Sequence, residues 1–555
     1  MIKEEIKKII EKAVKNSLKE TADFSVEMPG DKNHGDYSTN VALVLSKKIE
    51  KNPTKVASLI KKELEKQKNN LFKDVKIAGP GFINFFIADK VFTDSLKKID
   101  KDFGRNKELR NKKVIIDYTD PNPFKEFHIG HLMSNAIGES LSRIFEFQGA
   151  KIKRVCYQGD VGIHVAKAIW GKLKNPKESW GKSYAFGATV YKEDEKIAKE
   201  IMDLNKKIYE KSDKNINKLY DEGKEESLRN FDELYKKLGT KFDDFIFESQ
   251  VSDLGKKIVE AGLKDGIFEK GNNGAVIFKG EKYGLHTRVF VNSEGLPTYE
   301  AKDLGLAEIK YKKYAYDQSV IVTGNEVNDY FKVMLCAMAQ IFPELAKKTK
   351  HIGHGMLRLP EGKMSSRTGK IITGEYLIEK IEELVLEKIK DRKLSEIEKK
   401  EIIEKVAIGA VKYSILKQSI GSDIIYDFDK SISFEGDSGP YLQYSYARAQ
   451  SVLRKAKDEK IKVSFKKNPD EIGKLEKNMN YFPEVVEKAG KEYEPHFIVL
   501  YLTELAREFN NYYAKNKIVD KDDELSPYKI ALTEAFSIIM KNGLWLLGIE
   551  SLEKM

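Results

Sequence analysis

The chain has 555 residues, of which 33% are charged and 41% are hydrophobic, and its formal net charge is +11. This length exceeds what one hydrophobic core can organise, so three or four domains are expected, and the positive charge is compatible with an anionic partner. Two cysteines, Cys156 and Cys336, exclude a disulfide framework. No apolar run has the length of a membrane span, and the N-terminal residues differ from a secretory or transit peptide. We therefore expect a cytoplasmic protein that makes no membrane contact.

Residues 1–105 are predicted to form an α+β domain. Apolar residues recur at helical spacing from Ile6 to Val14, and a second helix is expected further on. Phe82, Asn84 and Phe86 then alternate with other residues after a Gly-Pro-Gly turn. This pattern is typical of a strand that a tight turn introduces.

Residues 106–375 are predicted to form a Rossmann-type α/β domain. The apolar runs 114–116, 152–156 and 319–322 alternate with helical patterns, which favours a parallel sheet with ligands at the carboxyl ends of its strands. A charged stretch at about 171–294 is expected to be a helical insertion between the two halves of that sheet.

The segment His128-Ile129-Gly130-His131 opens a predicted helix. Its i, i+3 spacing places both imidazoles on one side, beside backbone N–H groups that we expect to be unpaired and at the positive end of the helix dipole. Such a site can hold a polyphosphate, and Gly130 would let a flat base approach the backbone. The alternative is a pair of ordinary surface histidines.

A second segment, Lys363-Met364-Ser365-Ser366, follows Gly362 and supplies a cation and two hydroxyls. Each segment alone is a weak signal. Together, in this order and at this separation, they resemble the HIGH and KMSKS signatures of class I aminoacyl-tRNA synthetases, which activate amino acids with ATP.

Beyond residue 375 the chain is predicted to be helical. Residues 376–430 are expected to form a helical linker region, and residues 431–555 an all-α bundle. The strongest helical patterns cover residues 406–416, 441–456, 495–513 and 528–547.

Further segments narrow the resemblance to arginyl-tRNA synthetases, and they run through nearly the whole chain: residues 79–85, 117–127, 159–162, 299–303 and 434–444. The resemblance implies ATP-dependent activation of L-arginine, a requirement for tRNA in that step, and transfer of arginine to tRNA(Arg). It also implies that residues 1–105 and 431–555 bind tRNA, the latter at the anticodon, and that residues 376–430 contact its stem. ATP would arrive with Mg²⁺, and we expect no structural metal and a monomer.

The arginine pocket can also be examined physically. A buried guanidinium requires carboxylates in a bidentate arrangement. Asp117 ends the first strand of the α/β domain, and Asp303 follows Tyr299 by one helical turn. An isolated Asp303 would more often be a surface residue paired with Lys302, but its match to the family motif favours the pocket.

The resemblance assigns each site residue its role. The expected catalytic residues are His128, His131, Lys363 and Lys125. ATP-binding residues would be His128, Gly130, His131, Gly355, Met356, Lys363, Met364, Ser365 and Ser366. Arginine-binding residues would be Asp117, Asn122, His131, Tyr299, Asp303 and Asn328. tRNA-binding residues would be Asn40, Phe82, Asn84, Tyr441, Tyr444, Arg448, Asn511, Tyr513 and Met555, although a core role is as plausible for Tyr441 and Tyr444, and Phe82 could equally be core.

The chain departs from the family pattern at two positions. Ser366 stands where the KMSKS signature has its second lysine, and Lys125, three residues before His128, would supply that cation. Val327 stands where many members have a substrate-orienting glutamine, and Asn328 is a hypothetical substitute.

Three other functions fit the sequence less well. A cysteine-specific class I synthetase would need zinc ligands that two isolated cysteines do not supply. A non-catalytic tRNA-binding relative is opposed by the intact His128, His131 and Lys363. A small nucleotidyl transferase is opposed by the length of the chain and by its C-terminal helices.

Overall fold

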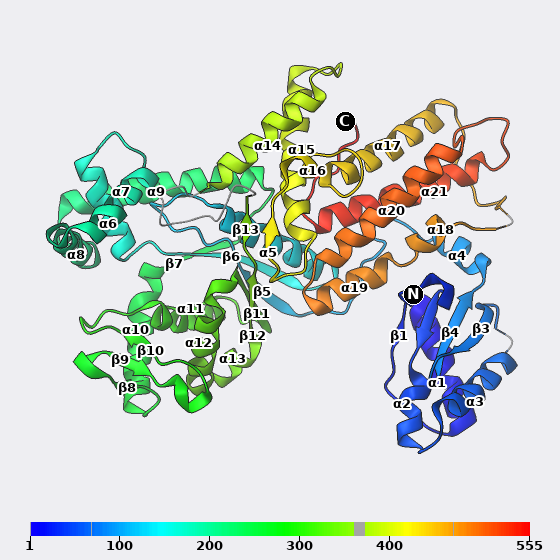
Figure 1. The fold of residues 1–555 in the computed structure, drawn as a ribbon, viewed down its shortest axis with the longest axis horizontal. Helices are drawn as coiled ribbons and strands as arrows, with labels where there is room; N and C mark the ends of the chain where they lie inside the picture. The colour runs from blue at the N-terminus through cyan, green and yellow to red at the C-terminus, as the bar shows by residue number, and fades with distance from the viewer. Residues whose placement is uncertain (1, 68, 360–371, 470) are drawn as a thin grey trace. The chain divides into compact units, whose positions relative to one another are not determined.

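The computed structural model describes residues 2–67, 69–359, 372–469 and 471–555 (Figure 1). The chain forms two compact units. Unit 1 comprises Met1–Phe103, Val452–Pro483 and Glu508–Ile539, and unit 2 comprises Gly104–Ser451, Glu484–Arg507 and Met540–Met555. No helix among the described residues is long and apolar enough to span a bilayer.

Unit 1 contains an antiparallel sheet in the order β1-β2-β4-β3. The predicted Gly-Pro-Gly turn joins β3 to β4, and Phe82 pairs with Ala78 across it. Apolar side chains from α1, α2, α3 and the sheet form one core. The elements are α1 (Ile2–Leu18), β1 (Val26–Glu27), β2 (Tyr37–Thr39), α2 (Val41–Lys48), α3 (Pro53–Lys66), β3 (Phe72–Ala78), β4 (Phe82–Ile87), α4 (Asp89–Leu96) and α18 (Lys474–Met479).

Unit 2 is built on a five-stranded parallel sheet in the order β12-β11-β5-β6-β7. Val114 and Ile116 of the central strand are fully buried and Ile115 nearly so, as expected for a strand covered on both faces. This sheet confirms the predicted Rossmann-type fold. Its strands are β5 (Lys113–Asp117), β6 (Lys151–Gln158), β7 (Asp244–Phe247), β11 (Gln318–Gly324) and β12 (Thr349–His354).

The stretch 171–294 is not a uniform helical insertion, because β7 lies within it and pairs with β6 in the main sheet. Helices α6–α9 do form a helical subdomain with its own apolar core, and β8–β10 form a small antiparallel sheet beside α10 and α11 (Figure 1). The elements are α6 (Ile163–Lys174), α7 (Trp180–Glu193), α8 (Glu195–Glu210), α9 (Lys214–Lys237), α10 (Glu248–Lys264), β8 (Glu269–Lys270), β9 (Val276–Phe278) and β10 (Arg288–Val291).

The remaining elements are mostly helical, as predicted. The predicted helices of the C-terminal region all occur, but α17, α19, α20 and α21 contribute residues to both units, so the units do not follow the predicted boundary at residue 431. These elements are α5 (Ile129–Phe147), α11 (Tyr299–Lys313), α12 (Asn328–Ile341), α13 (Pro343–Lys348), β13 (Leu357–Arg358), α14 (Gly374–Ile389), α15 (Glu396–Leu416), β14 (Ile424–Ile425), α16 (Phe428–Ser431), α17 (Gly439–Asp458), α19 (Phe482–Glu492), α20 (His496–Lys515) and α21 (Ser526–Leu546).

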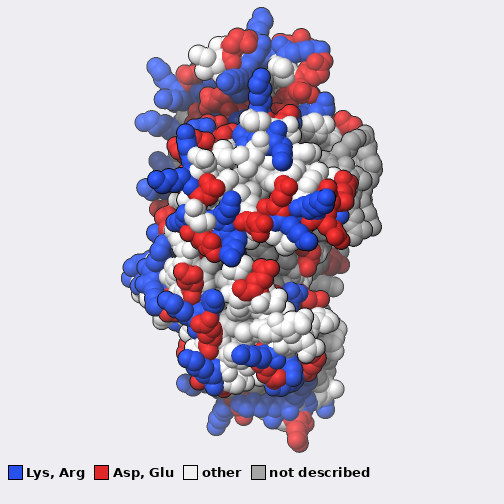
Figure 2. Space-filling model, turned by 90° about the vertical axis from the view of Figure 1, so that its left-hand side faces the viewer, with Lys and Arg blue, Asp and Glu red and all other residues white. Residues whose placement is uncertain are grey.

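Charged side chains of both signs are interspersed over the face shown in Figure 2. On the helices of the insertion, many lysines form i, i+4 pairs with acidic residues, such as Lys218 with Glu222 and Lys236 with Asp232. Exposed pairs of this kind contribute little to stability. The lysine-rich faces of these helices are therefore largely solvated surface, while their other faces form the apolar core.

Helices α10 and α11 cross at backbone contact distance. A Cβ atom at Gly255 would lie 2.1 Å from the carbonyl oxygen of Ala301, and one at Gly305 would lie 2.6 Å from that of Val251. The glycines therefore fix the position of α11 against α10. This matters for the site because α11 carries Tyr299 and Asp303.

We expect Gly255→Ala to lower the free energy of unfolding by about 1–3 kcal/mol, because the added methyl group forces the two helices apart. Urea or thermal denaturation measures this change. Gly30→Ala is the control, since a Cβ atom there meets nothing within 4 Å. Equal stability of the two variants would contradict the proposed role of the crossing.

Candidate functional site

The loop after β5 has an unusual backbone. Thr119, Asp120 and Phe124 have φ angles of 80°, 48° and 70°, in the left-handed region that non-glycine residues rarely adopt. Each such residue costs about 1–3 kcal/mol and persists only where neighbouring structure enforces it. The loop therefore has the character of a functional segment rather than of a simple connection.

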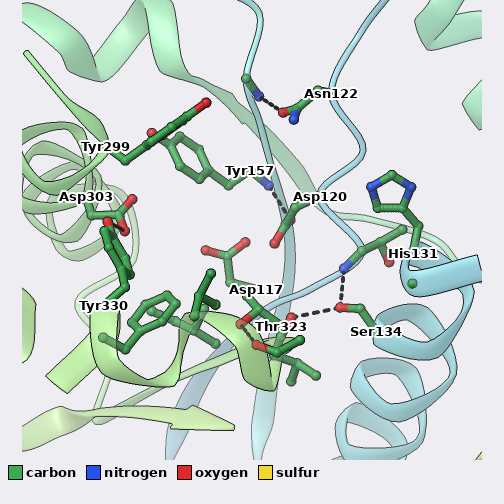
Figure 3. Close-up of a pocket in the computed structure, with 18 of the residues that line it drawn as sticks. Asp117, Asp120, Asn122, His131, Ser134, Tyr157, Tyr299, Asp303, Thr323 and Tyr330 are labelled. Carbon is green, nitrogen blue, oxygen red and sulfur yellow. Dashed lines mark hydrogen bonds between the residues drawn. The ribbon is translucent and has the colours of Figure 1, made fainter. Parts of the chain in front are cut away.

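Buried hydrogen bonds hold this loop. The Ser134 hydroxyl on α5 accepts from the Thr119 N–H at 2.9 Å and donates to the Val322 carbonyl at 2.7 Å. Asn135 donates to the Thr119 hydroxyl at 3.0 Å, and the Asp120 carboxyl accepts from the Tyr157 N–H at 2.8 Å. Three strands and α5 thus determine the loop conformation (Figure 3).

His128 and His131 cap the N-terminus of α5. The Nδ1 atom of His128 accepts from the Gly130 N–H, and the Nδ1 atom of His131 accepts from the His128 N–H, both at 3.1 Å. The two rings are stacked with centroids 3.6 Å apart. The sequence prediction that both imidazoles share one side is confirmed.

The prediction that the backbone N–H groups at this helix start are unpaired, in contrast, is wrong. The imidazoles accept from two of the first N–H groups, and those of Ile129 and His131 donate to the carbonyls of Ile372 and His128. The need for glycine at position 130 also has a different explanation from the predicted approach of a base, because a Cβ atom there would lie 2.9 Å from the His128 ring. A phosphate at this helix end would therefore be held by side chains rather than by these four backbone N–H groups.

The hydrogen bonds fix the protonation of these rings. A nitrogen that accepts from a backbone N–H carries no proton, so a neutral ring in this position has its proton on Nε2. Burial lowers the pKa of His128 to about 4, and burial together with the neighbouring His128 lowers the pKa of His131 well below its usual value. Both residues therefore present neutral Nε2–H donors near pH 7.

Three carboxyl groups converge in a cavity of about 430 Å³ that also includes the histidine pair. Asp117 ends β5, Asp120 lies in the loop, and Asp303 lies on α11 (Figure 3). The buried Lys310 donates to Asp117 Oδ2 at 3.2 Å, whereas Asp117 Oδ1 is buried and has no donor among the described residues. The cluster has more carboxyl groups than cations and fits a cationic ligand.

Asp303 is a pocket residue and not a surface partner of Lys302. The Lys302 ammonium instead contacts Glu248 at 2.6 Å, and both of these side chains are buried. The Tyr330 hydroxyl donates to Asp303 at 2.5 Å. Burial, with smaller contributions from Asp117 and Glu248, raises the pKa of Asp303 to about 7.

Aromatic groups complete this part of the cavity. Tyr299 lines it while remaining 56% exposed, and the hydroxyl of Tyr157 is buried without a hydrogen-bond partner among the described residues. Figure 3 shows both rings beside the carboxyl groups. An exposed aromatic ring at a cavity mouth can stack on a planar cation.

Asn122 lines the cavity, and its side-chain oxygen accepts from the Gly159 N–H at 2.8 Å. Lys125 is not among the lining residues; its ammonium lies 5.0 Å from the centroid of the Tyr184 ring. Burial lowers the pKa of Lys125 to about 8. Lys125 is therefore close in sequence to the histidine pair but partly withdrawn from the cavity.

The structure does not bring Asn328 into the cavity. Its exposed side chain lies over Gly353, where a Cβ atom would be 2.1 Å from the amide oxygen, whereas Val327 lines the cavity. Gly355 and Met356 are also absent from the lining, and the Met356 N–H donates to Asp423 at 2.9 Å. Lys363, Met364, Ser365 and Ser366 lie outside the described residues.

The candidate tRNA-binding residues of unit 1 differ in exposure. Phe82 is 40% exposed and Tyr513 is 41% exposed, and Asn511 is also exposed. Asn40 accepts from the Ser25 N–H. Asn84 is only 4% exposed and accepts from the Ser38 hydroxyl at 2.7 Å, so its burial within the sheet speaks against a side-chain contact to RNA.

In unit 2, Tyr441, Tyr444 and Arg448 lie along α17 and are partly exposed. The Arg448 guanidinium lies 4.8 Å from the centroid of the Tyr444 ring. Met555 is partly exposed as well. Partial exposure of Tyr441 and Tyr444 is compatible with both predicted roles, packing in the core and contact with RNA.

The sequence prediction did not include three lining residues, Asp120, Tyr157 and Tyr330, or Lys310, which contacts Asp117 from outside the lining. Tyr157 and Tyr330 come from β6 and α12, and no local pattern identifies them. Lys310 follows Asp303 by two helical turns, so its position on the same face of α11 was available as a signal. Asp120 lies within the 117–127 segment, and its position three residues after Asp117 is a further signal in the sequence.

Three family models match the chain in order. They describe the arginyl tRNA synthetase N terminal domain (residues 1–87), the catalytic domain of tRNA synthetases class I (R) (residues 95–428) and the DALR anticodon binding domain (residues 442–555). Together they cover most of the chain.

Curated relatives match over the whole length. An arginine–tRNA ligase of Fusobacterium nucleatum is 33% identical over 99% of both chains, and one of Clostridium acetobutylicum is 33% identical over 100% of this chain and 99% of its own. Among solved structures, the arginyl-tRNA synthetase of Thermus thermophilus has a TM-score of 0.83 at 21% identity, with complete coverage of both chains. That of Plasmodium falciparum has a TM-score of 0.80 at 21% identity, covering 100% of this chain and 99% of its own.

The buried neutral histidines predict a loss of stability in acid. The pKa of His128 is about 4 in the folded state, against about 6.5 when unfolded, so the unfolded state binds more protons between these values. The free energy of unfolding should therefore fall as the pH decreases from 6.5 to 4. Urea denaturation at a series of pH values measures this.

His128→Asn is the informative variant, because asparagine keeps an acceptor at the helix N-cap but has no titrating ring. It should show a smaller acid-induced loss of stability than the wild type. His34→Asn, at an exposed position of unit 1, is the control. An unchanged acid profile in His128→Asn would contradict the assignment.

Proposed function

The chain belongs to the arginyl-tRNA synthetase family of class I synthetases, and we propose that the cavity of unit 2 is where it activates L-arginine with ATP and transfers it to tRNA(Arg). The observation that carries this proposal is one cavity with two chemically different ends. Asp117, Asp120 and Asp303 form an anionic end, and His128 and His131 form an end with neutral donors. The first suits a guanidinium and the second suits phosphate oxygens.

Arginine would lie with its guanidinium among the carboxyl groups. Asp303 and the unpaired Oδ1 atom of Asp117 are acceptors for its N–H groups, and the Tyr299 ring would cover its flat face. Asn122 and His131 would contact the α-amino and carboxylate groups. Asn328 would not contact the substrate, because its side chain is not part of the cavity lining.

In the first step, the arginine carboxylate would attack the α-phosphorus of ATP, forming arginyl-adenylate and releasing pyrophosphate. In the second, a terminal ribose hydroxyl of tRNA would attack the adenylate carbonyl and release AMP. The protein's contribution is positioning and charge stabilisation. The Nε2–H groups of His128 and His131 would donate to phosphate oxygens as negative charge shifts toward the leaving group.

Lysines would stabilise the departing pyrophosphate. We assign this role to Lys125 and to Lys363, with Met364, Ser365, Ser366, Gly355 and Met356 contacting ATP as the family resemblance implies. Mg²⁺ would enter with ATP, since it prefers phosphate oxygens and water to a protein cage. Among the described residues, no group of three or more His, Cys, Asp or Glu side chains is arranged to hold a metal ion.

The tRNA would contact both units. Exposed aromatic rings such as Phe82 and Tyr513 can stack on unpaired bases, and Arg448 can contact phosphate. Asn40, Tyr441, Tyr444, Asn511 and Met555 remain candidates. We propose that the protein acts as a monomer in the cytoplasm, where tRNA is charged for protein synthesis.

The proposed activity predicts the result of an ATP–pyrophosphate exchange assay with each of the twenty amino acids. Exchange should occur with arginine alone, and only when tRNA is present. Exchange with arginine in the absence of tRNA would support arginine as the substrate and refute the dependence on tRNA. No exchange by folded protein that binds tRNA would refute the catalytic function.

Lys125→Ala should lower kcat of the activation step by about 100-fold or more, through loss of one phosphate contact in the transition state. Because the pKa of Lys125 is about 8, kcat/KM for ATP should also fall as the pH rises above 8, where the free enzyme loses this cation. Lys125→Arg keeps the charge and should remove this alkaline decline. Lys332→Ala, at an exposed position of α12, is the control. Near-normal turnover of Lys125→Ala would exclude the role.

A further inference from the structure

Asp120 is a third carboxyl group in a site where two would suffice to bind a guanidinium. It lines the cavity beside Asp117, and Figure 3 shows the two carboxyl groups directed toward each other. Asp117 and Asp120 thus face each other within the proposed guanidinium site. Lys310, which contacts Asp117, is the cation that this pair has nearby.

One buried oxygen of the Asp117–Asp120 pair lacks a hydrogen-bond donor unless one of the two carboxyl groups is protonated. Asp117 Oδ2 accepts from Lys310, and Asp120 Oδ1 accepts from the Tyr157 N–H. Asp117 Oδ1 is buried and lacks a donor among the described residues. Two ionised carboxylates cannot hydrogen-bond to each other, whereas one protonated carboxyl group supplies the missing donor.

The backbone shows that this arrangement is enforced. Asp120 has a φ angle of 48°, and its neighbour Thr119 is held at 80° by Ser134 and Asn135. A loop without these constraints would let the two like charges separate. Burial, and secondarily the charge of Asp117, raises the pKa of Asp120 well above its ordinary value.

We propose that Asp120 is a specificity-determining residue that holds a proton shared with Asp117 in the empty site, and that arginine binding displaces this proton into solvent. The proposal rests on the proposed function, because it takes the guanidinium as the ligand of this cluster. The exchange is close to neutral in charge: one guanidinium replaces one proton. A neutral isostere such as citrulline provides no positive charge to replace the proton and is rejected.

Other titratable and charged groups face Asp120 and contribute to the pH response. Asp303, with a pKa of about 7, is the strongest of these, and it would also release a proton when arginine binds. The comparison of variants at Asp120 is therefore needed to isolate its share. The groups are Asp117 on β5, Cys156 and Tyr157 on β6, Tyr235 on α9, Glu248 on α10 paired with Lys302, Asp303 and Lys310 on α11, and Tyr330 on α12.

The test is calorimetric titration of L-arginine into the full-length protein at pH 6 and pH 8, in buffers with different ionisation enthalpies. The slope of the observed enthalpy against the buffer enthalpy gives the number of protons released. At pH 6 the wild type should release up to one proton more than Asp120→Asn. As the pH falls, the dissociation constant of the wild type for arginine should also rise more steeply than that of Asp120→Asn. The Asp120 proton should contribute up to about tenfold per pH unit.

Asp120→Asn suits this test because it tolerates a positive φ, keeps an acceptor for the Tyr157 N–H and donates permanently to Asp117. It imitates the protonated state, so arginine binding at pH 8 should weaken by about tenfold or more. Asp120→Ser removes the carboxyl group and should also lose the proton release. Asp329→Asn, at an exposed carboxylate paired with Lys332, is the matched control and should behave as the wild type.

Each outcome is decisive. Equal proton release by the wild type and Asp120→Asn at both pH values, with arginine still bound, would overturn the inference and leave the proposed function intact. Absence of arginine binding by the wild type would refute the proposed function itself. If Asp120→Asn binds arginine as tightly as the wild type does, and citrulline no more tightly, the specificity role would be overturned.

Discussion

The hydroxyl of Ser134 joins the three parts of the molecule from which the site is made. It accepts from Thr119 in the loop after β5 and donates to Val322 of β11, while its own backbone belongs to α5. Because the loop backbone is in the left-handed region, it would relax without such a constraint. The positions of Asp117, Asp120 and the histidine pair all depend on this connection.

The constrained loop separates two electrostatic environments within one cavity. On one side, buried carboxyl groups outnumber the cations, and the resulting shortage of positive charge would attract a cationic ligand. On the other side, His128 and His131 use Nδ1 to cap their own helix, which leaves the proton of each neutral ring on Nε2. Neutral donors stabilise negative charge as it develops without repelling an approaching cation.

A second buried network lies behind the site in unit 2. The Tyr118 hydroxyl donates to Glu139 on α5 at 2.6 Å, and Arg143 contacts both Glu139 and the Trp545 carbonyl. The Lys412 ammonium on α15 donates to the carbonyls of Leu238 and Gly548. The first set of bonds therefore fixes the middle of α5 against Tyr118 and the Trp545 carbonyl, and the second fixes α15 against the segments at Leu238 and Gly548.

The amino-acid sequence by itself determined the elements and the chemistry. Apolar periodicity located the strands around Val114, Cys156 and Ile321, the i, i+3 spacing placed the two histidines together, and the acidic and aromatic residues near Asp117 and Tyr299 indicated a guanidinium pocket. Only the tertiary structure decided which groups meet. It assigned β7 to the main sheet, paired Lys302 with Glu248, buried Asn84, turned Asn328 away and brought Asp120, Tyr157 and Tyr330 into the cavity. These outcomes depend on strand order, on helix crossings at glycine and on left-handed backbone in non-glycine residues. Such features arise from contacts between residues far apart in the chain, such as Asp117 and Lys310 at a separation of 193 positions, and no local pattern records them.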